Sequence, residues 1–192
     1  MLAQLRALLH ITRSHLIARR YFVVNGFDGV LTMVGLLVGF RLGEASALEV
    51  MIRVCLGAAI ALGVSGVSSA YISEAAEKLR ELRALERAML ADLGESTYGR
   101  GARVLPFVIA LVNGSAPLVM ALAIIAPLWA AHAGLALPLA PLDAALAVAL
   151  TLVFLLGVYI GRISGTFWLW AGLRTLAVAA LTAGLVALVS PR

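Results

Sequence analysis

The chain has 192 residues, of which 62% are hydrophobic and 13% are charged, and its formal net charge is +5. Soluble domains carry about 25% charged residues, so this chain has too few polar groups to cover its own surface. A mean hydropathy of +1.03 over a length typical of one domain therefore favours a single membrane domain. The basic residues lie between hydrophobic stretches rather than in one patch, which argues against nucleic-acid binding.

Residues 1–20 precede the first long apolar stretch and are predicted to form an amphipathic helix at the cytoplasmic interface. Arg6, His10, Arg13 and His15 interrupt the apolar residues of this segment. A secretory signal peptide needs an uninterrupted apolar core and a small-residue cleavage site, and both are missing. The arginines would instead lie near anionic lipid headgroups.

Five stretches reach the roughly 20 apolar residues that cross a bilayer as a helix. They are expected at residues 22–42, 48–73, 104–131, 142–163 and 167–189. Residues 132–141 are predicted to form a short turn. The predicted fold class is therefore all-α, a polytopic membrane protein of five transmembrane helices, with residues 1–192 forming a single membrane domain.

The basic residues predict the orientation of these helices. All 15 lysines and arginines except Arg41, Arg53 and Arg192 lie before the first span, between the second and third, or between the fourth and fifth. Because short cytoplasmic loops carry an excess of basic residues, the chain is predicted to run N-in and C-out. Residues 74–103 then form a cytoplasmic segment between the second and third spans.

This cytoplasmic segment has helix-forming composition and no break before Gly94, so the second helix is expected to extend into the cytoplasm. Its acidic stripe falls within about 60° of a helical wheel and consists of Glu74, Glu77, Glu81 and Asp92. Glu86 points away from this stripe. One interpretation is an amphipathic helix solvated by Glu–Arg pairs. The other is a site where carboxylates gather a divalent cation, for which oxygen ligands are suited.

Asp28 is a carboxylate within the first predicted span. Such residues are costly in a bilayer and usually mark an ion pathway or a proton relay. A polar stripe within about 80° of the wheel comprises Asn25, Asp28, Thr32, Gly35 and Gly39. The opposite face, with Leu31, Val34 and Val38, is expected to contact lipid. The alternative is that Asp28 lies near the cytoplasmic helix end and reaches the interface.

Small and hydroxylated residues predict helix contacts in other spans. Ser65, Ser69 and Ser73 repeat every four residues and share one side of the second span, where they either line a cation path or pack against a helix. The glycines of the first span and the series Gly157, Gly161 and Gly165 are typical of close helix packing.

An enzyme would need a nucleophile, a base and an orienting group that converge. The sequence contains no nucleophile elbow, phosphate loop or metal-protease motif, so no enzymatic activity is expected.

Several segments together resemble the vacuolar iron transporter family, in particular its short prokaryotic members. They are Asp28-Gly29 with Thr32, Gly35 and Gly39, then SGVSSAYISEAAEK, LERAML, the region 114–117 and GRISGTFWLWAGLRTLAVAALTAG. These segments occur in the family's order and cover most of the chain. The sequence departs from the plant members at Ala70, where they have a glutamate, and in its shorter cytoplasmic segment.

The resemblance implies a homodimer of five-helix chains that moves Fe(II) or Mn(II) out of the cytosol by proton exchange. It implies lipid, divalent metal ions and a second copy as partners, no permanently bound cofactor, and location in a prokaryotic cytoplasmic membrane. It assigns metal handling to Asp28, Glu74, Glu77 and Glu81. Further candidates for the pathway are Asn25, Thr32, Met33, Ser69, Ser73, Glu86, Met89 and Asp92. The alternative is a non-transporting dimeric membrane scaffold or a metal-sensing protein whose acidic cytoplasmic helix binds a partner.

Overall fold

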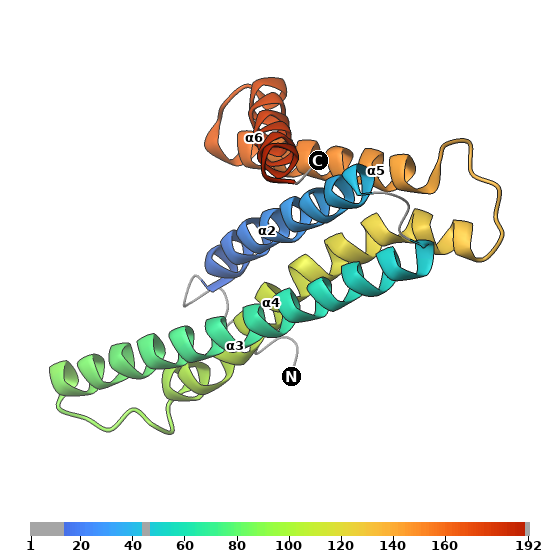
Figure 1. Ribbon diagram of the computed structural model, residues 1–192. Helices are drawn as coiled ribbons and strands as arrows, with labels where there is room; N and C mark the ends of the chain where they lie inside the picture. Colours follow the sequence, from blue (N-terminus) through green and yellow to red (C-terminus); the bar gives the residue numbers. More distant parts are fainter. Residues whose placement is uncertain (1–13, 44–46, 191–192) are drawn as a thin grey trace. The chain divides into compact units, whose positions relative to one another are not determined.

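The computed structural model describes residues 14–43 and 47–190, and all of its regular secondary structure is helical (Figure 1). The helices are α2 (Ser14–Leu42), α3 (Leu48–Met89), α4 (Thr97–His132), α5 (Pro141–Ser164) and α6 (Trp168–Val189). By length and composition, five helices in these residues are able to cross a membrane. The prediction of an all-helical chain with five such helices is confirmed.

The first helix begins earlier than its apolar stretch. Helix α2 runs without a break from Ser14, so residues 14–20 belong to the same helix as the first predicted span. The rest of the predicted interfacial helix, residues 1–13, lies outside the described residues. The predicted turn at 132–141 is confirmed, because α4 ends at His132 and α5 begins at Pro141, a residue whose fixed φ suits a first helical position.

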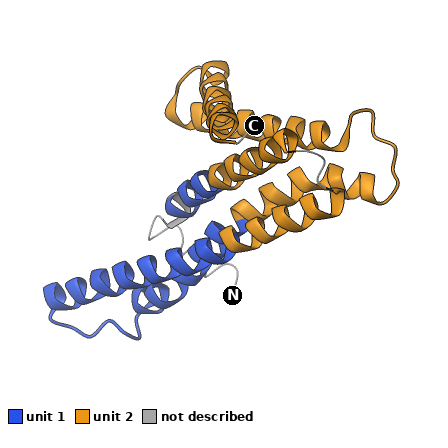
Figure 2. Ribbon diagram, in the orientation of Figure 1, with its two compact units in different colours: residues 1–25, 63–115 blue, residues 26–62, 116–192 orange. Residues whose placement is uncertain are grey.

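The chain divides into two compact units (Figure 2). Unit 1 comprises residues 1–25 and 63–115, and unit 2 comprises residues 26–62 and 116–192. Helices α2, α3 and α4 each contribute residues to both units, whereas α5 and α6 belong to unit 2 alone.

Unit 2 contains a continuous apolar core. Met33, Val34 and Leu37 of α2 are at most 1% exposed and pack with residues of α3, α4, α5 and α6. Leu31 and Val38 are partly buried against the same core. The expectation that this face of α2 contacts lipid is therefore wrong: it faces the protein interior, and the exposed side of the helix carries Asp28.

Only some of the glycines expected to make close helix contacts in unit 2 do so. A Cβ atom on Gly29 would lie 2.7 Å from the Cα atom of Pro117, so α2 and α4 approach closely there. Gly35 and Gly39 have no comparable neighbour. Among the glycines of α5, the prediction holds for Gly157 and Gly161, which pack against α6. It is wrong for Gly165, which ends α5 in the left-handed conformation (φ 70°) with open space around it.

Helix α3 ends before Gly94, contrary to the sequence-based expectation. Leu90 adopts φ 50°, a conformation that L-residues rarely take and that terminates the helix after Met89. The next helix begins with Ser96 as its N-cap, whose Oγ accepts a hydrogen bond from the Gly99 amide at 3.0 Å. Asp92 therefore lies in the α3–α4 turn and not on the acidic stripe of α3.

Candidate functional site

One face of α3 in unit 1 is buried along about five turns, with a spacing of three or four residues. The buried positions are Gly63, Gly66, Ala70, Glu74, Lys78 and Leu82. The face thus changes from small residues to charged ones without leaving the protein interior. Glu74 is 8% exposed and Lys78 is 5% exposed. Buried carboxylates and ammonium groups are rare unless they are paired, so their partners are the first question.

Two glycines explain why these side chains are enclosed. A Cβ atom on Gly66 of α3 would lie 3.1 Å from the Cα atom of Gly114 in α4. A Cβ atom on Gly114 would collide with Val67. The two backbones therefore meet at this point. Residues one to four turns farther along the same face of α3 project into the space between the helices of unit 1.

Asn113 joins α2, α3 and α4 beside this crossing. It is 3% exposed, and its Nδ2 donates a 2.7 Å hydrogen bond to the carbonyl oxygen of Gly66. Its Oδ1 accepts a hydrogen bond from Nδ2 of Asn25, which also donates to the carbonyl oxygen of Tyr21 at 3.2 Å. Asn25, a predicted pathway residue, is therefore part of an interhelical contact.

Glu74, which is buried, and Glu81, which is partly exposed, have different partners. Glu74 Oε1 accepts a 3.0 Å hydrogen bond from the hydroxyl group of Tyr21 in α2. Glu81 Oε2 accepts from Lys78 Nζ at 2.7 Å and from the hydroxyl group of Tyr98 in α4 at 3.2 Å. We call this set the polar cluster; it comprises Tyr21, Asn25, Glu74, Lys78, Glu81, Tyr98 and Asn113.

The predicted metal ligands are thus only partly together. Glu74 and Glu81 belong to the polar cluster, whereas Glu77, on the same stripe of α3, is exposed and is not a member of it. Asp28 belongs to unit 2 and is exposed, although it lies in a helix apolar enough to cross a membrane. In the described part of the chain, no three His, Cys, Asp or Glu side chains converge in an arrangement that could hold a metal ion. Metal binding by these four carboxylates therefore stays a prediction.

The other pathway candidates do not share one environment. Met33 is fully buried in the apolar core of unit 2. Ser69, Ser73 and Met89 are exposed. Thr32 Oγ1 donates to the carbonyl oxygen of Asp28 at 2.7 Å, a bond within its own helix. None of these side chains is a member of the polar cluster.

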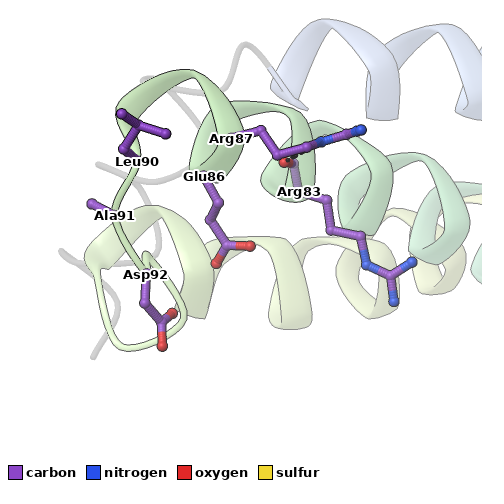
Figure 3. Close-up of a pocket in the computed structure, with 6 residues that line it drawn as sticks. All are labelled: Arg83, Glu86, Arg87, Leu90, Ala91 and Asp92. Carbon is purple, nitrogen blue, oxygen red and sulfur yellow. Dashed lines mark hydrogen bonds between the residues drawn. The ribbon is translucent and has the colours of Figure 1, made fainter.

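Glu86 and Asp92 stabilise the turn that follows α3. Glu86 Oε1 accepts from the Leu93 amide at 3.2 Å, and Asp92 Oδ1 accepts from the Gly94 amide at 2.8 Å. Both line an open depression of about 880 Å³, together with Arg83 and Arg87 (Figure 3). Two guanidinium groups balance the two carboxylates, so this surface has no excess negative charge with which to attract a cation.

Sequence reasoning missed Lys78, Tyr21, Tyr98 and Asn113. Two signals were present. Lys78 follows Glu74 by four residues, which places both side chains on one face of a helix. Asn113 is an amide within an apolar span, beside a glycine, and polar residues in spans often join helices. The tyrosines gave no local signal, because their partners lie 53 and 17 residues away in sequence.

Comparison with known proteins shows a distant similarity over most of the chain. No family model matches the chain, and no solved structure matches it. The chain is 28% identical over 170 residues to an uncharacterized protein of Methanocaldococcus jannaschii. The alignment covers 82% of this chain and 81% of that protein, so the similarity extends over most of both.

Proposed function

We propose that this chain is a multi-pass membrane transporter that moves divalent metal ions, Fe(II) or Mn(II), out of the cytosol in exchange for protons. The observation that carries the proposal is the polar cluster. Glu74 and Lys78 are nearly fully buried on a helix that is otherwise apolar enough to cross a membrane. Both lie beyond the part of α3 that would cross the membrane, and ionisable groups buried in a protein are costly unless paired, which makes their cluster a candidate functional site. The resemblance to the vacuolar iron transporter family supplies the class of substrate.

In this proposal the metal ion first meets the carboxylates of α3. Glu74, Glu77 and Glu81 occupy successive turns, and oxygen ligands suit Mn(II) and, with a softer ligand, Fe(II). Glu74 must leave Tyr21 and Glu81 must leave Lys78 before either carboxylate can serve as a full ligand. Loading therefore includes a rearrangement of the polar cluster. The metal then passes to Asp28, where a proton and a metal ion compete for the same oxygens.

The exposure of Asp28 supports a dimer. A charged carboxylate at the centre of a lipid-facing span costs about 2.5–3.5 kcal/mol on insertion scales. A second copy of the chain placed against this side of α2 would remove Asp28 from lipid and enclose a hydrated path. We therefore propose that the transporter is a homodimer in which Asp28 faces the partner subunit.

The length of α3 supports the proposed orientation. Its 42 residues give a helix of roughly 63 Å at 1.5 Å per residue, about twice the hydrocarbon thickness of a bilayer. The C-terminal half of α3 carries most of its charged residues, so this half would extend into the cytoplasm. With the excess of basic residues on the same side, the chain runs N-in and C-out. We place it in a prokaryotic cytoplasmic membrane.

Calorimetry tests the cytoplasmic site. Replacing Glu74, Glu77 and Glu81 together by Gln removes three charges but keeps hydrogen-bonding groups, so Mn(II) affinity should fall at least about tenfold. The matched control is Glu49→Gln, which removes an exposed carboxylate from the opposite end of α3, where it pairs with Arg53. Unchanged Mn(II) affinity in the triple variant would mean that the acidic stripe does not bind the metal ion and is only the solvated face of an amphipathic helix.

A second candidate function is a dimeric membrane scaffold or a metal sensor whose α3 extension binds a partner. The observation that favours it is the absence, in the described residues, of three carboxylates that already converge on one point. Transport distinguishes the two: a scaffold or sensor catalyses no metal flux when it is reconstituted alone in vesicles.

A further inference from the structure

Lys78 is the only lysine among the 15 basic residues of the chain. Every arginine that the structure describes is exposed, whereas Lys78 is 5% exposed. Among the described residues, the basic side chain is therefore arginine at every exposed position and lysine at the one buried position. The two side chains differ physically, because a guanidinium is broad and planar while an ammonium is a compact point charge on a flexible stem. A compact charge resembles a metal cation more closely.

The Lys78 ammonium is paired with Glu81, one of the carboxylates to which the proposed function assigns metal collection. Its Nζ lies 2.7 Å from Glu81 Oε2, and the same oxygen accepts the Tyr98 hydroxyl. Glu74 lies one turn earlier on the same buried face of α3. The ammonium carries three donors, and Glu81 is its one acceptor in the described part of the chain. The positive charge that neutralises Glu81 is thus supplied by the protein's own ammonium group and not by a bound cation.

We propose that Lys78 is a built-in cation that occupies Glu81 in the metal-free protein, and that a divalent ion loads by displacing it. This inference rests on the proposed transport function and adds a specificity-determining residue to it. A monovalent ion brings no more charge to Glu81 than the ammonium that it would replace, so it gains nothing by displacing it. A divalent ion attracts the carboxylate with twice the charge at the same distance. Lys78 therefore favours divalent over monovalent ions and rebinds Glu81 when the metal leaves.

The wild-type chain allows a direct test, because its only primary amines are Lys78 and the chain's N-terminal amine. The detergent-solubilised, full-length protein is treated with an amine-acylating reagent, and the rate of modification at each amine is read by mass spectrometry. Without metal, Lys78 should react slowly. Saturating Mn(II) should raise its rate several-fold, while the N-terminal amine keeps its rate and K⁺ at equal ionic strength has no effect. A Lys78 rate that stays constant or falls while Mn(II) is bound would overturn the proposal.

A charge-removal variant gives an independent measurement. Mn(II) binding is followed by the electron paramagnetic resonance signal of the free ion, for wild type, Lys78→Gln and Arg80→Gln. Arg80 is exposed two residues away on α3 and serves as the matched loss of one positive charge. Lys78→Gln should bind Mn(II) about tenfold more tightly or better, and Arg80→Gln should stay close to wild type.

The outcomes separate the two proposals. Wild-type binding with no gain in Lys78→Gln, or an equal gain in Arg80→Gln, overturns the role of Lys78 and leaves the proposed transport function intact. No Mn(II) binding in any of the three proteins overturns both. If Lys78→Gln does not fold, the amine-modification experiment on the wild-type chain decides the question alone.

Discussion

Gly29 determines how closely α2 and α4 approach within unit 2. Its missing side chain leaves room for Pro117, whose Cα and Cβ atoms would lie 2.7 and 2.9 Å from an added Cβ. Both contacts involve atoms that cannot rotate away, so Gly29→Ala must push the helices apart. We expect a loss of about 1–3 kcal/mol of stability, the usual cost of overpacking.

Gly39 is the matched control for Gly29 on the same helix. An added Cβ at Gly39 meets nothing within 4 Å. Gly39→Ala should therefore leave stability unchanged or raise it slightly, since alanine is the better helix former. Thermal unfolding in detergent, followed by circular dichroism, measures both variants. Equal midpoints for the two variants would contradict the close approach at Gly29.

The residues of the site differ in how visible they are in the sequence. Asp28 stands out, because it is a lone carboxylate in an apolar span. Lys78 does not, because a helical wheel separates the charges into arcs without saying which arc is inward. That information comes from Gly66 and Gly114, whose contact fixes the buried side of α3. The pairing of Tyr21 with Glu74 depends on tertiary structure alone.

At the scale of the helices, the lengths of the apolar stretches predicted the number of helices well. They did not predict which face of each helix points into the protein. Five apolar runs gave five helices because each run alone satisfies its backbone hydrogen bonds in lipid. The inward face of α2 was assigned wrongly, since lipid tails and a helical core are equally apolar and hydrophobicity does not distinguish them. The end of α3 was missed because Leu90, a good helix former, adopts the left-handed conformation there.

Cysteine labelling tests the proposed path of these helices through the membrane. The native Cys55 is fully buried and should not react, so any labelling comes from the introduced cysteine. Ala84→Cys, on the exposed C-terminal part of α3, should react with a membrane-impermeant maleimide only from the cytoplasmic side. Leu135→Cys, in the turn after α4, should react only from the opposite side.

Two labelling results would contradict the proposed topology in different ways. Reaction of both positions from one side would contradict the predicted number of crossings between them. Reaction from reversed sides would contradict the N-in orientation, while leaving the helices and their contacts unaffected.

At the scale of the whole molecule, the exposed side of α2 predicts self-association. Val24 is 52% exposed and lies one turn before Asp28. If a second copy covers this side of the helix, Val24→Cys should form an oxidised dimer in native membranes. The wild type, whose single cysteine is buried, should not. A strictly monomeric Val24→Cys protein would count against the dimer proposed around Asp28.

The most direct test of the account is metal flux through the purified protein. Wild type, Asp28→Asn and the exposed-carboxylate control Glu49→Gln are reconstituted into vesicles, and Mn(II) uptake is measured with and without a proton gradient. We expect gradient-dependent uptake for wild type and Glu49→Gln, and at least about a tenfold loss for Asp28→Asn, since an amide can neither exchange a proton nor neutralise the metal ion. Equal rates in wild type and Asp28→Asn, with no dependence on the proton gradient, would contradict proton-coupled transport through Asp28.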